Sequence, residues 1–225
     1  MVQEPHHLLQ QKPQAVLFDW DNTLVDSWQL LHTVLNLTLK SYGMPEWSEE
    51  EVTARSHRSM REAFPHIFGD QWEEAGRKFH QIYQEVHLDY LQALPGAEAV
   101  LTELCRIGVY LSIVSNKTGK FLRKEVEVLG WGKYFDMVVG ATDTPKDKPA
   151  IDMPTKALEN LPHYEHSKVW LVGDTKIDLE CASNFGCRAV LFGVSKYGHH
   201  EELLPMADGY IPDHANFLEL LKGYA

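Results

Sequence analysis

Two aspartates, Asp19 and Asp21, stand one residue apart in the segment VLFDWDNTLVDS (16–27). They follow the apolar run Ala15 to Phe18, which is typical of a short buried strand. Aspartate is depleted in strands, and two like charges this close repel each other. One interpretation is an ordinary turn that ends the strand. The other is a reaction centre that needs two carboxylates with different roles.

Polar groups that could do chemistry also follow three other predicted strands. Ser115 and Asn116 end the segment VYLSIVS, Lys148 lies in the loop after the next strand, and Asp174 follows KVWLVG. In parallel sheets, ligands bind outside the carboxyl ends of the strands. The sequence therefore predicts that carboxylates and cationic or hydroxyl donors from four distant segments meet at one edge of a sheet.

The elements that must position these groups alternate between helix and strand after Pro95. This alternation predicts an α/β fold, with a Rossmann-like, doubly wound, mostly parallel sheet covered by helices on both faces. The expected strands are 15–18, 109–115, 135–139, 168–173, 187–193 and 209–211. The expected helices of this part are 97–107, 119–129, 153–160, 176–185 and one from about Ala215.

Between the first strand and this alternating region, the chain has helical periodicity and no convincing strand. We expect helices over 27–43, 48–64 and 73–94, the second opened by a capping box of Ser48 and Glu51. This segment is far longer than an ordinary connection. We therefore predict a core domain of residues 1–27 and 92–225, interrupted by a helical domain of residues 28–91.

Charge and composition exclude several classes of function. The formal net charge of −11 argues against a general affinity for nucleic acid or anionic membranes, whose binding surfaces are basic. No apolar run approaches transmembrane length, and the polar start lacks a signal-peptide hydrophobic region, so we expect a soluble cytoplasmic protein. The three cysteines have no metal-like spacing, and Cys105 and Cys181 are expected to be core residues of helices.

Four segments in order resemble the haloacid dehalogenase (HAD) superfamily of phosphohydrolases, specifically members with a helical cap inserted after the first motif. FDWDNTLVDS is similar to motif I, VSN to motif II, the lysine of KDKPAIDMPTKAL to motif III and VGDTKIDLECA to motif IV. The stretches LPGAEAVLTEL and GCRAVLFGVSKYG resemble the phosphoglycolate phosphatase-like branch. One departure is KPAI, where many relatives read KPxP, but it leaves Lys148 in place.

The resemblance implies a role for each matching residue. Asp19 is the expected nucleophile, which forms an aspartyl-phosphate, and Asp21 is the expected general acid and base. The implied cofactor is Mg²⁺, with ligands from Asp19, the main-chain carbonyl of Asp21 and Asp174, while Asp178 is expected either to bind the metal directly or to orient the groups around it. The substrate phosphate is expected to meet Ser115, Asn116 and Lys148, and Thr23 is expected to steady the motif I loop or to take part in substrate binding.

Structural alternatives exist for most of these residues. Asp174 could be a helix N-cap, and Asp178 could simply favour the positive end of a helix. In the predicted cap, Arg58 is a candidate for binding a carboxylate or a second anion of the substrate, but its spacing to Glu62 is also that of a surface ion pair. Lys117, just after motif II, is a comparable candidate for substrate contact. Trp20, between the two aspartates, could help to shape the pocket.

The expected function is that of a Mg²⁺-dependent phosphatase acting on a small organic phosphomonoester, with phosphoglycolate as one candidate. A phosphomutase or phosphonatase on the same core stays open, as does a non-catalytic phospho-acceptor or regulatory module. The expected partner is a small phosphorylated metabolite rather than nucleic acid or membrane, and the expected state is a monomer or weak homodimer.

Overall fold

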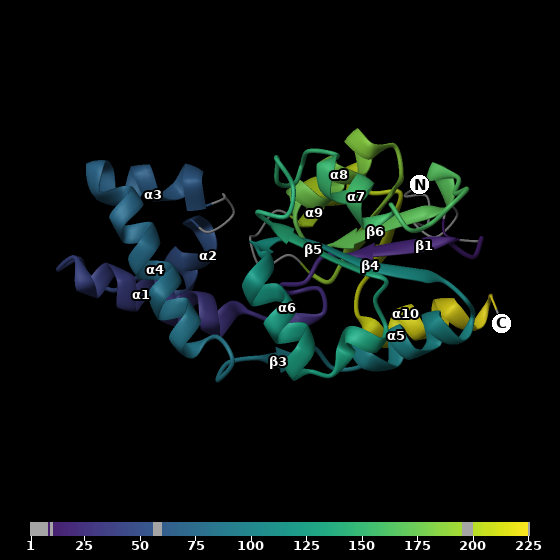
Figure 1. Cartoon of the computed structure of the whole chain (residues 1–225), viewed down its shortest axis with the longest axis horizontal. Coiled ribbons are helices and arrows are strands. Elements are labelled where there is room, and N and C mark those ends of the chain that lie inside the picture. Colours follow the sequence, from purple (N-terminus) through teal and green to yellow (C-terminus); the bar gives the residue numbers. More distant parts are fainter. Residues whose placement is uncertain (1–8, 10, 56–59, 195–199, 225) are drawn as a thin grey trace. The chain divides into compact units, whose positions relative to one another are not determined.

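A computed structural model describes residues 9, 11–55, 60–194 and 200–224 (Figure 1). The chain divides into two compact units, residues Met1–Val25 with Ala93–Ala225, and residues Asp26–Gln92. It passes from one unit to the other at two short strands, β2 (Val25–Asp26) and β3 (Gln92–Ala93). We describe each unit by itself.

The first unit contains a six-stranded parallel sheet with the order β5-β4-β1-β6-β7-β8. This arrangement confirms the predicted α/β fold class. The first strand of the chain is central, because it pairs with β4 on one side and with β6 on the other. The strands are β1 (Ala15–Phe18), β4 (Tyr110–Thr118), β5 (Met137–Ala141), β6 (Val169–Gly173), β7 (Arg188–Phe192) and β8 (Gly209–Ile211).

The helices of this unit follow the predicted order, with boundaries that shift by a few residues. The predicted helix 153–160 ends early, at Ala157, and a short helix after residue 199 had not been predicted. The helices are α5 (Ala97–Arg106), α6 (Gly119–Val128), α7 (Asp152–Ala157), α8 (Lys176–Phe185), α9 (His200–Leu203) and α10 (His214–Lys222).

Helices cover both faces of the sheet, with α7 and α8 on one face and α5, α6 and α10 on the other (Figure 1). All four residues of β1 are completely buried and divide between the two faces. Ala15 and Leu17 pack into the cluster that includes α7 and α8, whereas the ring of Phe18 contacts Phe217 of α10. Because alternate residues of a strand point to opposite faces, β1 has to be apolar throughout, and the chain can become polar only after Phe18.

The second unit is helical, with a core of its own built around Leu35, Leu39, Phe64 and Phe68. Its helices are α1 (Trp28–Ser41), α2 (Glu49–Arg55), α3 (Met60–Phe68) and α4 (Trp72–Val86). The predicted capping box opens α2, since Ser48 N–H donates to Glu51 Oε2 at 2.9 Å and Glu51 N–H donates to Ser48 Oγ at 3.2 Å.

Two boundary predictions in this unit were wrong. The segment 48–64, predicted as one helix, contains α2 and the start of α3, on either side of the undescribed residues 56–59. The third helix ends at Val86 rather than near residue 94, because turn-type bonds such as that from Asp89 N–H to Val86 C=O replace the helical ladder.

Two further expectations concern exposure and membranes. Cys105 was expected in the core but is exposed, because the buried face of α5 carries Ala97, Val100, Leu101 and Leu104 and the next residue points outward. Cys181 is buried as expected. Across the described residues, no helix has both the length and the apolar character needed to cross a bilayer.

Candidate active site

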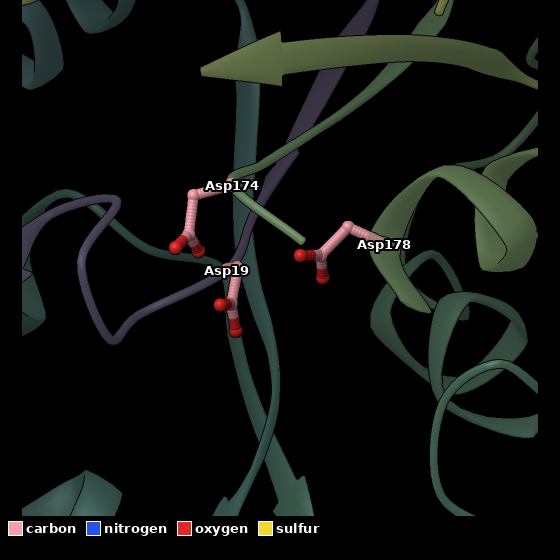
Figure 2. A group of neighbouring side chains, drawn as sticks. All are labelled: Asp19, Asp174 and Asp178. Atoms are coloured by element: carbon pink, nitrogen blue, oxygen red, sulfur yellow. The ribbon is translucent and has the colours of Figure 1, made fainter. Parts of the chain in front are cut away.

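Three aspartates meet at the carboxyl end of the central strands (Figure 2). Asp19 directly follows β1, and its N–H donates to the carbonyl of Val172 in β6 at 2.8 Å. Asp174 directly follows β6, and Asp178 belongs to the first turn of α8. Each is buried, with at most 8% of the whole residue exposed, and each offers a carboxylate oxygen within 4.8 Å of the others.

The turn from β6 into α8 fixes Asp178. Thr175 is the N-cap of the helix, and its N–H and hydroxyl both donate to Asp178 Oδ2, at 3.0 and 2.6 Å. The N-cap is thus Thr175 and not Asp174, so the alternative that Asp174 serves as a cap is wrong. A Cβ atom on Gly173 would lie 2.3 Å from Asp178 Cγ, so only glycine lets the carboxylate approach the strand this closely.

Lys148 is the cation of the cluster. Its ammonium donates to Asp19 Oδ1 at 2.8 Å and to Asp178 Oδ1 at 2.7 Å, and its side chain is only 3% exposed. Lys146, the other lysine of this loop, is exposed. One buried ammonium therefore joins the carboxylates that follow β1 and begin α8.

The side chain of Asn116 holds the backbone on which Lys148 sits. Its Nδ2 donates to Lys148 C=O at 3.0 Å, and its Oδ1 accepts from Lys148 N–H at 2.8 Å. The peptide bond from Lys148 to Pro149 is cis. The sequence had indicated only the backbone of Asn116 as a phosphate ligand, and this side-chain contact was missed.

Ser115 is buried just before an irregularity in β4, where the pairing register with β5 shifts between Ser115 and Thr118. Its hydroxyl accepts from the N–H of Lys117 at 3.3 Å. The strand had been expected to end at residue 115, but it continues to Thr118 after the shift. Ser115 and Asn116 thus lie where the ladder is interrupted, beside the loop that carries Lys148.

Two other predicted site residues lie in the motif I loop. Thr23 is completely buried, and its hydroxyl is 3.5 Å from Asp174 Oδ1, at the outer limit of a hydrogen bond. The side chain of Asp21 is 29% exposed, and its Oδ1 lies 2.7 Å from the ammonium of Lys117. Arg58, the predicted substrate contact of the helical insertion, lies outside the described residues.

Burial and mutual repulsion govern the charges of this cluster. Burial raises the pKa of Asp19 to about 6; the carboxylates of Asp178 and Asp21 act in the same direction and Lys148 opposes them. Burial also raises the pKa of Asp174 well above its usual range, with further effects from Asp19 and Asp178. Burial alone would lower the pKa of Lys148, but the carboxylates of Asp178 and Asp19 outweigh it and raise that pKa.

The cluster therefore holds more buried negative charge than one lysine can neutralise. Buried carboxylate oxygens close together are the ligands that a hard divalent cation prefers, and the cation would remove the repulsion that raises these pKa values. The residues present fit such a cation. Asp19 and Asp174 are better placed than Asp178 to bind it, since Lys148 and Thr175 already bond both oxygens of Asp178.

Sequence reasoning missed Glu125 and the contacts that join it to Trp20 and Lys117. The indole N–H of Trp20 donates to Glu125 Oε2 at 2.6 Å, and Lys117 pairs with the same carboxylate at 2.6 Å. A signal for Glu125 was present, because it stands at helical spacing from Phe121 and Leu122 on the otherwise apolar face of α6. A carboxylate on a buried apolar face predicts a buried cationic or hydrogen-bonding partner, because an unpaired charge there is unfavourable.

The sequence model of the haloacid dehalogenase-like hydrolases matches residues 16–192, from the strand before Asp19 to the end of β7. The chain belongs to this family. The resemblance indicated by the four motifs is thereby confirmed, and the chain is a hydrolase of the haloacid dehalogenase-like type.

Several relatives of this hydrolase are named as phosphatases or pyrophosphatases. A protein of Aquifex aeolicus named phosphoglycolate phosphatase is 31% identical over 179 residues, which cover 79% of this chain and 84% of the relative. A putative pyrophosphatase PpaX of Caldanaerobacter subterraneus is 27% identical over 212 residues, covering 94% and 96%. The crystal structure of a predicted phosphoglycolate phosphatase from Haemophilus somnus has the same fold, with a TM-score of 0.80, 24% identity and coverage of 93% and 98%.

Proposed function

We propose that this chain is a Mg²⁺-dependent phosphatase that hydrolyses a small organic phosphomonoester through an aspartyl-phosphate on Asp19. The observation that carries the proposal is the contact of Lys148 with both Asp19 and Asp178, beside Asp174, in one buried cluster. A buried nucleophile next to a fixed cation and a divalent-cation site is what phosphoryl transfer requires.

In the first step, a carboxylate oxygen of Asp19 attacks phosphorus. A bond forms between that oxygen and phosphorus, the bond from phosphorus to the ester oxygen breaks, and Asp21 gives a proton to the departing alcohol. Lys148 stays paired with Asp19 Oδ1 and offsets the negative charge that gathers where phosphate and nucleophile meet.

In the second step, water hydrolyses the aspartyl-phosphate. Asp21, now ionised, takes a proton from the water. The oxygen of that water bonds to phosphorus, and the bond between phosphorus and the Asp19 oxygen breaks. Asp21 has the more exposed side chain of the pair, 29% against 11% for Asp19, which suits exchange of protons with substrate and water. The two aspartates then divide the chemistry as nucleophile and proton carrier.

The remaining residues bind and orient. Ser115 and the backbone of Asn116 hold phosphate oxygens, and Asp178 orients Lys148. A magnesium ion bound by Asp19, Asp174 and the carbonyl of Asp21 would neutralise part of the phosphate charge and lower its repulsion with the nucleophile.

The substrate is a small phosphorylated metabolite. Phosphoglycolate is the first candidate, because relatives that carry this name align with most of the chain. Pyrophosphate is the second, because of the relative named as a putative pyrophosphatase. The helical insertion, residues 28–91 by sequence, is proposed to be the cap that distinguishes among such compounds.

The test is phosphate release from a panel of phosphoglycolate, pyrophosphate, sugar phosphates and p-nitrophenyl phosphate, each with Mg²⁺ and with a chelator. We expect release only with Mg²⁺, a ranking of substrates by kcat/KM, and loss of activity in Asp19→Asn. The matched control is Asp136→Asn, the same change at the opposite end of the sheet, where Asp136 accepts from Leu111 N–H. Undiminished turnover by Asp19→Asn would overturn the assignment of Asp19 as the nucleophile.

The same experiment separates the other activities that the fold allows. A phosphomutase would return the phosphoryl group to a second position of its substrate, and a phosphonatase would cleave a bond between carbon and phosphorus. A phospho-acceptor module would hold an aspartyl-phosphate for minutes without releasing phosphate. Steady release from esters favours the phosphatase over all three.

A further inference from the structure

Trp20, the residue between Asp19 and Asp21 of motif I, is completely buried. Its indole ring packs edge-on against Trp131, with ring centroids 5.8 Å apart. Its N–H donates to Glu125 Oε2 at 2.6 Å. Both the apolar body of the side chain and its polar atom are therefore fixed.

Glu125 accepts two donors on one oxygen. It lies on α6 with 1% exposure, and Oε2 bonds the indole of Trp20 and the ammonium of Lys117, each at 2.6 Å. A buried carboxylate without partners would be strongly destabilising. Trp20 and Lys117 together offset that cost.

Lys117 carries the connection back to motif I. Its side chain is 6% exposed, and its ammonium lies 2.7 Å from Asp21 Oδ1 as well as 2.6 Å from Glu125 Oε2. The contacts thus form a closed ring: Trp20 to Glu125, Glu125 to Lys117, Lys117 to Asp21, and the peptide bond from Asp21 back to Trp20. We call Trp20, Glu125 and Lys117, the three residues that complete this ring with Asp21, the Asp21 ring.

The backbone of motif I is fixed at the same point. The carbonyl of Trp20 accepts from the N–H groups of Leu24 and Val25, at 2.9 and 3.2 Å, and Asn22 adopts a left-handed conformation with φ of 58°. The main chain around Asp21 is therefore held by a tight turn. Its carboxylate is held separately, by Lys117.

We propose that Trp20, Glu125 and Lys117 are positioning residues that aim the carboxyl group of Asp21 at the leaving group. The inference rests on the proposed function, because it takes Asp21 as the group that moves the proton. An apolar cluster could fill the same space without the desolvation of two charges, so packing alone does not explain a buried Glu–Lys pair. The pair ends on Asp21, the more exposed of the two aspartates that flank Trp20.

The variants Lys117→Met, Glu125→Gln and Trp20→Phe test this with two kinds of ester. The phenolate of p-nitrophenyl phosphate leaves without needing a proton, whereas an alkyl alcohol needs one. As the alkyl ester we use the alkyl phosphate of the panel for which the wild type has the highest kcat/KM. General acid catalysis contributes about 10²–10⁴-fold, so we expect misplacement of Asp21 to lower kcat/KM for the alkyl ester about tenfold more than for p-nitrophenyl phosphate.

The control is Lys124→Met. Lys124 lies on the same helix and pairs at 3.0 Å with Glu127, but both side chains are exposed. We expect Lys124→Met to leave kcat/KM unchanged for both esters. Lys117→Arg, which keeps the cation, is expected to recover part of the selectivity that Lys117→Met loses, while thermal unfolding reports on the fold of each variant.

The outcomes are distinct. Equal loss on both esters, or no loss, in those variants that remain folded would overturn the positioning role while leaving the phosphatase intact. If Glu125→Gln does not fold, Trp20→Phe and Lys117→Met still test the positioning role, since the first removes one contact of the ring and the second removes two. Absence of Mg²⁺-dependent release by the wild type would instead overturn the proposed function, and this inference with it.

Discussion

The side-chain amide of Asn116 brackets the backbone of Lys148, donating to its carbonyl at 3.0 Å and accepting from its N–H at 2.8 Å. Asn116 follows the buried part of β4, whereas Lys148 lies in a loop 32 residues later. The pair of bonds imitates the pairing of two strands. It gives the loop a fixed position relative to the sheet, and with it the ammonium that bonds Asp19.

Replacing Asn116 by alanine should therefore reduce activity through Lys148. Removal of a residue that orients a ligand-binding group commonly costs about 10–100-fold in activity, and we expect a fall in kcat within that range. The matched control is Asn184→Ala, since exposed Asn184 donates only one bond to the same loop, at Pro149 C=O (2.9 Å). Equal kcat for Asn116→Ala and wild type would show that the loop needs no such support.

Lys148→Met should lose both activity and stability. Loss of one preorganised cationic donor costs about 10²–10³-fold in kcat, and breaking a buried ion pair costs about 3–5 kcal/mol in the free energy of unfolding. Denaturant unfolding without metal measures the second effect. Lys146→Met, in the same loop but exposed, is the control and should change neither.

The double variant Lys148→Met with Asp178→Asn separates these two effects. Removing the second charge should restore part of the free energy of unfolding, because Asp178 no longer lies buried without its cation. It should not restore kcat. Recovery of activity in the double variant would contradict the role given to Lys148.

Divalent cations should stabilise the protein through the aspartate cluster. A ligand at a hundred times its Kd adds about 2.7 kcal/mol to the free energy of unfolding, so Mg²⁺ should raise the Tm of the wild type. In Asp174→Asn this shift should be lost, while the metal-free Tm should equal or exceed that of the wild type, because burial and repulsion raise the pKa of Asp174. Asp136→Asn should retain the full shift.

His214 should make the folded state sensitive to mild acid. Burial lowers its pKa to about 4 from an ordinary 6.5, against the opposing effect of Asp213, and its Nε2 has no hydrogen-bond partner among the described residues. Between these two pH values the unfolded chain binds a proton that the folded chain does not. The free energy of unfolding should therefore fall by about 3 kcal/mol from this residue as pH drops from 6.5 to 4.

His214→Gln cannot titrate and should have a flatter dependence on pH in that window. Urea unfolding at several pH values measures the difference from wild type. His163→Asn, at an exposed histidine, is the control and should retain the wild-type slope. The same slope for His214→Gln and wild type would contradict the assignment to His214.

The parts of the site that could be predicted from sequence are those fixed by a neighbouring strand. Asp19 and Asp174 follow β1 and β6, which are adjacent in the sheet, so the end of each strand places its aspartate at the shared edge. The alternation of strand and helix was enough to predict this edge. The branch of the family could likewise be predicted from its motifs.

The parts that could not be predicted depend on contacts between distant side chains. Trp20 and Glu125 are 105 residues apart, and nothing in motif I indicates that its variable position donates to a carboxylate on α6. Lys117 was considered only as a contact to substrate, because its sequence position gives no sign of two carboxylate partners. The end of α4 was also mispredicted, because local turn-type hydrogen bonds follow Val86 in a stretch whose apolar pattern had indicated more helix.

The most direct test of the account is to quench wild-type protein within milliseconds of mixing with Mg²⁺ and its best substrate, and to analyse its peptides by mass spectrometry. We predict a phosphoryl group on Asp19 that forms and decays at rates compatible with turnover, and none on the corresponding peptide of Asp19→Asn. Rapid turnover by the wild type with phosphate never found on Asp19, or found on another residue, would contradict the account.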